Sequence, residues 1–80
     1  MKQEAIKLES RYKDVDSNLI QIEDNKYLLN TNSEYIRLSR AENRTIYSID
    51  LEGGPMIDVG NTIQGKKVKS IKSQYVIEFE

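Results

Sequence analysis

The side chains available for chemistry are carboxylates, amines, guanidinium groups and hydroxyls, because the 80-residue chain contains no histidine and no cysteine. This absence removes the commonest general base, the usual nucleophile–base pairs and most transition-metal ligands. Serine–lysine and paired-carboxylate mechanisms remain, but each needs a desolvated pocket that a chain of this length has little volume to enclose. We therefore expect a non-enzymatic protein with no catalytic residue and no bound cofactor.

One segment, Asp14-x-Asp16-x-Asn18, begins like a calcium-binding loop. The match fails where the geometry is strictest, since Leu19 stands where the loop needs glycine and Asn25 where it needs a bidentate glutamate. The sequence therefore predicts no metal site, and the segment is typical of a polar connection that leads into a strand.

A second group of side chains is basic and lies near the C-terminus, beside an aromatic residue: Lys66, Lys67, Lys69, Lys72 and Tyr75. On a small barrel, such lysines contact phosphates while the tyrosine stacks on a base. Against this, Lys67 and Lys69 are expected to face Glu80 and Glu78 across a hairpin, and the net charge of −1 attracts neither nucleic acid nor an anionic membrane. A nucleic-acid-binding barrel is thus the alternative hypothesis.

The third group is the outward face of a predicted hairpin over residues 35–51. Tyrosine and arginine are enriched at interface hot spots, and an exposed isoleucine beside them is unusual for plain solvent contact. Another part of the chain covering this face is the competing interpretation. If the face is open, we expect it to bind a partner through Tyr35, Arg37, Arg44 and Ile46.

That hairpin has the clearest pattern in the chain. With a turn over residues 41–44, in which Asn43 tolerates a left-handed conformation, Leu38 faces Tyr47 and Ile36 faces Ile49. These four apolar side chains are predicted to form a core face, and the alternate residues point outward.

Two further hairpins follow from the same test. Around the loop Asp24-Asn25, Ile22 is expected to face Tyr27 and Ile20 to face Leu29. Around Ser73-Gln74, the predicted partners are Val68 with Phe79, Ser70 with Ile77 and Lys72 with Tyr75. Residues 53–55 break the chain between hairpins, and a short strand is expected over residues 56–59, with Ile63 filling the core from a loop.

The segment before the hairpins has two competing periods. Ala5, Leu8, Tyr12 and Val15 recur at helical spacing, whereas Ile6 and Leu8 alternate as in a strand, and the composition favours a short N-terminal helix over residues 2–16. The glycine and apolar pattern from Gly60 to Phe79 resembles the turn-and-hairpin unit of many small SH3-like barrels. We therefore expect one mainly β domain over residues 1–80, either a small antiparallel barrel or a two-layer sandwich.

The functional hypothesis that combines these points is a protein–protein interaction module that binds another protein or a second copy of itself. The chain has no apolar run long enough to span a bilayer and no signal peptide, which favours a cytoplasmic protein without a membrane partner. Abundant isoleucine, asparagine, lysine and tyrosine are typical of AT-rich bacterial or phage genomes, where small accessory or inhibitory proteins are common.

Overall fold

The computed structural model describes residues 4–54, 56–72 and 75–80, and these residues form one mainly β, antiparallel sheet. Its nine strands are β1 (Ala5–Leu8), β2 (Ser17–Glu23), β3 (Lys26–Thr31), β4 (Ile36–Arg40), β5 (Ile46–Leu51), β6 (Met56–Asp58), β7 (Thr62–Ile63), β8 (Lys66–Lys72) and β9 (Val76–Phe79). Their order is β1-β2-β3-β9-β8-β5-β4, with β6 paired to β5 and β7 to β8. Since β1 and β4 end this path, the described strands form an open sheet and not a closed barrel.

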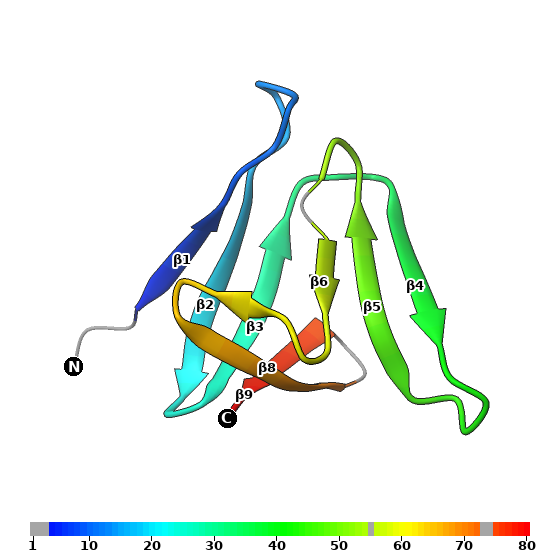
Figure 1. Ribbon diagram of the computed structural model, residues 1–80. Helices are drawn as coiled ribbons and strands as arrows, with labels where there is room; N and C mark the ends of the chain where they lie inside the picture. Colours follow the sequence, from blue (N-terminus) through cyan, green and yellow to red (C-terminus); the bar gives the residue numbers. More distant parts are fainter. Residues whose placement is uncertain (1–3, 55, 73–74) are drawn as a thin grey trace.

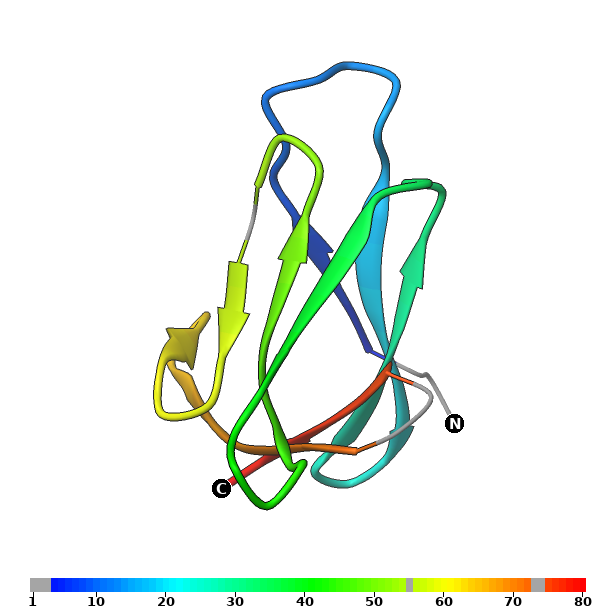
Figure 2. The same cartoon turned by 90° about the vertical axis from the view of Figure 1, so that its right-hand side faces the viewer.

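The sheet is divided into two groups of strands that are joined at one end. Figure 1 shows β1, β2 and β3 on one side, β4, β5 and β6 on the other, and β8 with β9 crossing between them in the lower half of the molecule. The crossing strands connect the groups, because β9 pairs with β3 at Tyr27↔Ile77 and β8 pairs with β5 at Ile46↔Ile71. The view in Figure 2 shows that the sheet is strongly curled, with β1 behind β4 and β5.

The hydrophobic core consists of side chains from both groups and from the crossing strands. Tyr27 is fully buried, and its ring meets the ring of Phe79 edge-on, with centroids 5.2 Å apart. The remaining buried apolar residues are Ile6, Leu8, Leu19, Leu29, Ile46, Ile49, Leu51, Ile57, Val68, Ile71 and Ile77. Because the chain has no cysteine to form a disulfide, burial of these side chains supplies most of its stability, at about 1.5–3 kcal/mol for each large one.

The predicted hairpins are present, and two of the turns lie where the sequence places them. Glu23 pairs with Lys26 across the Asp24-Asn25 loop, and the Arg44 amide donates a 2.9 Å hydrogen bond to the Ala41 carbonyl. The left-handed position in the second turn was wrong, since it is Arg44 that has a φ of 67°. The predicted third turn, residues 73–74, lies outside the described residues.

Each hairpin contains a register shift, where one strand carries an extra residue. Two of the shifts lie close to the turn, and the shift in β8 lies near the open end of its hairpin. The extra residues are Ile22 in β2, Tyr47 in β5 and Lys69 in β8. Beyond each shift the predicted partners change: Leu38 faces Ile49 instead of Tyr47, and Ile20 faces Leu28 instead of Leu29. Such bulges bend a strand and increase its twist, which accounts for the curl of the sheet.

The bulges also change which side chains point inward. An extra residue reverses the alternation of a strand, so two buried positions come to lie three residues apart. Ile46 and Ile49 in β5 show this spacing, and so do Val68 and Ile71 in β8. On the turn side of the shift in β8, Ser70 faces Glu78 and Lys72 faces Val76, so the predicted pairs of Ser70 with Ile77 and Lys72 with Tyr75 were wrong by one residue. On the other side of the shift, Val68 faces Phe79 as predicted.

The predicted N-terminal helix is absent from the described residues, which contain the alternative strand. β1 pairs antiparallel with β2, with Ile6 opposite Leu19, and this pairing buries Ile6 and Leu8 on one face. Burial at alternate positions outweighs the helix propensity of a four-residue segment. The short strand expected over residues 56–59 is confirmed as β6, and Ile63 packs against the core from β7.

The two groups of strands also touch at the end opposite the crossing strands. The Arg11 amide, in the loop after β1, donates a 3.1 Å hydrogen bond to the Gly53 carbonyl, in the loop after β5. Gly53 has a φ of 76°, and a Cβ atom added there would lie 2.8 Å from Cδ2 of Tyr12. The tight approach of these loops therefore depends on glycine at position 53.

Candidate interaction surface

The structure separates the four residues predicted to bind a partner. Tyr35 is 47% exposed, and Arg37 and Arg44 are also exposed. Ile46 is only 5% exposed, so its assignment to the outward face was wrong. The bulge at Tyr47 rotates Ile46 into the core, where it pairs with Ile71 of β8.

Tyr47 takes the outward position, although the alternation of the strand places it in the core. Its side chain is 49% exposed, beside two other exposed apolar residues of the following segment, Met56 at 55% and Val59 at 40%. The Val59 amide donates a 2.9 Å hydrogen bond to the Tyr47 carbonyl, and Met56 pairs with Asp50 of β5. The only sequence signal for this arrangement is the three-residue spacing of Ile46 and Ile49, which strict alternation does not explain.

These residues belong to one surface, the β4–β6 face, which we define as Arg37, Tyr47, Asp50, Met56, Asp58 and Val59. All six line a shallow depression of about 580 Å³. Arg37 lies opposite Asp50, and Asp50 lies opposite Met56, so the three form one row across β4, β5 and β6. Ser39, Ser48 and Asp58 form the next row.

The charges of the β4–β6 face are not neutralised by ion pairs within the described residues. The ion pairs among the described residues are Lys26–Glu23, Lys66–Glu4 and Lys67–Glu80. None of them includes a residue of the β4–β6 face. Asp58 accepts one hydrogen bond, of 3.1 Å, from the Asn61 side-chain amide. The face thus combines exposed apolar side chains with a guanidinium group and two carboxylates.

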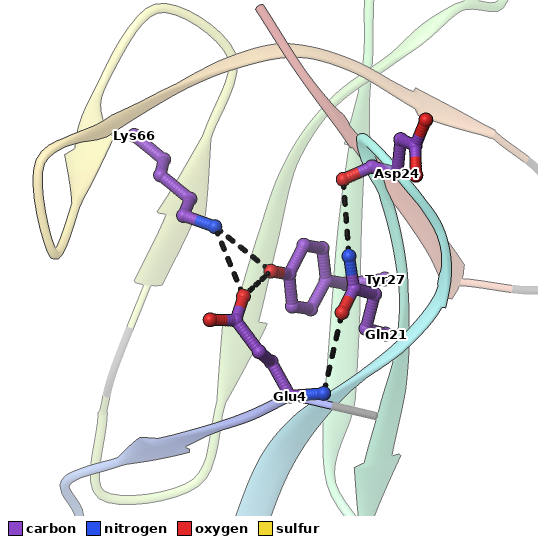
Figure 3. A network of polar contacts seen from close by, with 5 residues as sticks. All are labelled: Glu4, Gln21, Asp24, Tyr27 and Lys66. Atoms are coloured by element: carbon purple, nitrogen blue, oxygen red, sulfur yellow. Dashed lines mark hydrogen bonds and ion pairs between the residues drawn. The ribbon is translucent and has the colours of Figure 1, made fainter. Parts of the chain in front are cut away.

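A second polar arrangement, the Tyr27 cluster (Glu4, Tyr27 and Lys66), lies where β1, β3 and β8 meet (Figure 3). The Tyr27 hydroxyl donates a 2.8 Å hydrogen bond to Oε2 of Glu4 and accepts a 2.9 Å hydrogen bond from Nζ of Lys66. The Lys66 ammonium also lies 3.3 Å from the same glutamate oxygen and 5.1 Å from the centre of the tyrosine ring. Glu4 is further held by its amide, which donates to the Gln21 side chain at 3.2 Å.

The electrostatics of the Tyr27 cluster favour a structural role. The bond from Tyr27 and the nearby Lys66 charge hold the pKa of Glu4 below its ordinary value of 4.5. The bond to the Tyr27 hydroxyl raises the pKa of Lys66 above 10.5. Because a general base must be unprotonated near neutral pH, a lysine with a raised pKa is unsuited to that role.

The lysines of the alternative nucleic-acid face lie near glutamates. Lys66 contacts Glu4 and Tyr27, as described above, whereas Lys67 lies 3.9 Å from Glu80, as predicted. The predicted pairing of Lys69 with Glu78 was wrong, because Lys69 is the bulge residue and Glu78 faces Ser70.

The other two members of that predicted face differ from each other in exposure. Lys72 is exposed, whereas Tyr75 is partly buried against the core and has a φ of 62°. The Ser70 hydroxyl donates a 2.9 Å hydrogen bond to Oε1 of Glu78. That bond is the main cause that lowers the pKa of Glu78, with smaller contributions from Lys69, Lys72 and Lys26.

The comparisons with known proteins give no indication of function, so a functional proposal depends on the geometry described above. No helix in the described part of the chain has the length and apolar character needed to cross a membrane. No protein-family model matches the sequence, and neither the curated proteins nor the solved structures that were compared include a match.

Proposed function

We propose that the chain is a non-enzymatic protein–protein interaction module that binds its partner through the β4–β6 face. The observation that carries this proposal is the grouping of Tyr47, Met56 and Val59, each at least 40% exposed, around one depression. An exposed apolar group rimmed by charged side chains is the usual character of a protein-binding surface on a small soluble domain.

The composition of the face fits the energetics of protein interfaces. Tyrosine and arginine supply much of the binding energy at such surfaces, and methionine adapts its shape to a partner. Tyr35 and Arg44, the other exposed members of the predicted surface, lie at the two ends of the β4–β5 hairpin and extend the contact area. Tyr47 therefore takes the place of Ile46 in the proposed binding surface.

The remaining parts of the proposal concern scaffold and setting. The strongly curled sheet supports a relation to small SH3-like barrels in which the edges β1 and β4 are left unjoined. The composition supports a small bacterial or phage accessory or inhibitory protein that acts in the cytoplasm. The alternative of nucleic-acid binding is weakened by the contacts that Lys66 and Lys67 make with glutamates.

Capture experiments with matched variants test the proposal. The immobilised protein is incubated with bacterial lysate and with the free protein, and Tyr47→Ser and Met56→Ser are compared with Ile22→Ser, which removes an apolar side chain of 46% exposure from the β2 bulge. We expect the two face variants to weaken capture of a discrete protein by at least about tenfold.

The control variant Ile22→Ser should leave capture unchanged, because Ile22 lies outside the β4–β6 face. Absence of any captured protein, or equal capture by all variants, contradicts the proposal. A titration with single-stranded DNA and RNA at low salt addresses the alternative, since phosphate contacts are strongest there.

A further inference from the structure

We infer that the free edge of β1 pairs with the β1 edge of a second copy, so that the two sheets join in an antiparallel, two-fold symmetric dimer. The inference goes beyond the proposed function, because β1 contributes no residue to the β4–β6 face. It rests on the backbone groups that β1 leaves unpaired and on the spacing of Lys7 and Glu9, which suits a strand that pairs with itself.

The pairing of β1 with β2 determines which backbone groups of β1 face outward. Hydrogen bonds in an antiparallel ladder join the residues of every second pair, and the Gln21 amide donates a 2.8 Å bond to the Glu4 carbonyl. The even-numbered residues of β1 therefore bond to β2, whereas the N–H and C=O groups of Ala5 and Lys7 point to the free side. Glu9, the next odd-numbered residue, follows the strand directly.

The free side of β1 is open in the single chain. β1 ends the strand order, and no other described strand than β2 pairs with it; Figure 1 shows it at the left margin of the molecule. The side chains of Lys7 and Glu9 are exposed and take part in none of the ion pairs among the described residues. With Leu8 they line a depression of about 710 Å³ that continues over the loop after β1. An unpaired edge of this kind is a template for another strand.

The charges of β1 select one register for a second copy. A two-fold axis that crosses the paired strands at Leu8 places Lys7 of each copy directly opposite Glu9 of the other. Each such pair can exchange two backbone hydrogen bonds and brings opposite charges together on one face. The smallest shift that keeps both cores on the same side is two residues, and it places either Lys7 or Glu9 opposite its own copy.

The second free edge, β4, lacks this complementarity. It carries Arg37 and Arg40 and no carboxylate, so two copies of β4 would bring only positive charges together. Each copy has one β1 edge, which pairing covers. Association through β1 therefore ends at a closed dimer, as expected for an isologous interface.

Sedimentation velocity from micromolar to millimolar concentration, with charge variants, tests this inference. Lys7→Glu and Glu9→Lys each place like charges opposite one another at both contacts of the dimer, and we expect each to weaken dimerisation about tenfold or more. The double variant Lys7→Glu with Glu9→Lys restores opposite charges, so it should dimerise like the wild type. Lys72→Glu, which makes the same charge change at an exposed position of β8, is the control and should dimerise normally.

A proline variant tests the backbone bonds separately from the charges. Lys7→Pro and Lys7→Ala both remove the ammonium group, but only proline also removes the outward N–H, which β2 does not use. We expect Lys7→Pro to stay monomeric while Lys7→Ala still dimerises. Circular dichroism shows whether the monomer keeps its fold, and the double charge variant decides the question if proline disturbs it.

Three results would overturn the inference. They are a wild type that stays monomeric at millimolar concentration, a double variant that stays monomeric when the wild type dimerises, and a dimer that is lost in Tyr47→Ser. The last result would assign the dimer to the β4–β6 face. A dimer that survives Tyr47→Ser but not Lys7→Glu supports the β1 edge, whatever the capture experiments show for the proposed function.

Discussion

Tyr27 and Tyr47 each follow closely on a hairpin turn, yet their surroundings are opposite. Tyr27 is fully buried, its ring packs on Phe79, and its hydroxyl is bonded to both Glu4 and Lys66. Tyr47 is half exposed beside Met56 and Val59, and none of the side-chain hydrogen bonds in the described residues includes its hydroxyl. In the first region the polar and aromatic groups satisfy one another, and in the second they remain available to a partner.

The difference shows that residue type alone does not identify a binding surface. Both regions combine a tyrosine with a carboxylate and a cation, which are the side chains of many interfaces. In the Tyr27 cluster these groups bond to one another and hold the start of β1 against β3 and β8, so their contacts stabilise the folded chain. On the β4–β6 face, the side chains of Arg37, Tyr47 and Asp50 make no hydrogen bond or ion pair within the described residues.

The largest expected effect is a difference in the free energy of unfolding between variants of two neighbouring residues of β5, Ile46 and Tyr47. Ile46→Ser removes a buried side chain and introduces a hydroxyl, and should lower the free energy of unfolding by about 3 kcal/mol or more. For a chain of this size, that loss lowers Tm by more than about 12 °C. Tyr47→Ser, at the exposed bulge position, should change the free energy by less than about 0.5 kcal/mol. Thermal and urea unfolding measure both, and equal effects would contradict the inward rotation of Ile46.

The next effect concerns the loops after β1 and β5, through which the two groups of strands touch. Gly53→Ala places a Cβ atom 2.8 Å from the Tyr12 ring in a left-handed conformation, and should cost about 2 kcal/mol. Gly54→Ala has the same backbone strain, with a φ of 77°, but no atom within 4 Å of the added Cβ, and should cost about 1 kcal/mol. Urea unfolding of the two variants isolates the loop contact, and a greater loss for Gly54→Ala would show that the contact contributes nothing.

A smaller effect compares the two tyrosine hydroxyls directly. Tyr27→Phe keeps the buried ring but removes the hydroxyl shared by Glu4 and Lys66, and should lower the free energy of unfolding by about 1 kcal/mol. Tyr47→Phe removes a solvent-facing hydroxyl and should leave stability unchanged within about 0.5 kcal/mol. Chemical unfolding of both variants is the measurement, and a loss in Tyr47→Phe would mean that its hydroxyl has an internal partner.

The smallest effect is a pH dependence of the Tyr27 cluster. The pKa of Glu4 is lower in the folded chain than its ordinary value of 4.5, so the ionised carboxylate contributes stability above pH 4.5. That contribution falls away as the pH drops through the lowered pKa. The Tm difference between wild type and Glu4→Gln should therefore be constant near pH 7 and shrink below pH 4.5. A difference that does not change down to pH 3 would contradict the role of the ionised Glu4.

The sequence predicts the local features of the hairpins well, because turns depend on residues close together in the chain. The Asp24-Asn25 loop and the turn over residues 41–44 are both where the polar residues place them. The predicted contact of Lys67 with Glu80 is correct as well. The predicted pairing of Ile22 with Tyr27 next to the first loop was wrong, because Ile22 is the bulge residue and Tyr27 faces Gln21. The correctly placed turns need only the preferences of a few adjacent residues.

The candidate site could be predicted only in part, because a bulge is a response to the packing around it. Arg37 and Tyr35 are exposed as expected, but Ile46 and Tyr47 exchange their predicted positions. The exchange occurs where β5 stops pairing with β6 and meets β8 at Ile71, which is far away in the sequence. The alternation of residues along one strand depends only on that strand, so it does not predict a bulge caused by a strand that is distant in the sequence.

The sequence by itself determined a small β-rich chain without histidine or cysteine and the positions of two of its turns. Tertiary structure decided that residues 5–8 form a strand, that the curled sheet stays open, and that Tyr27 is enclosed while Tyr47 is exposed. The physical reason is that turns and composition are local properties, whereas register and exposure depend on which distant strands compete for the same backbone and the same core.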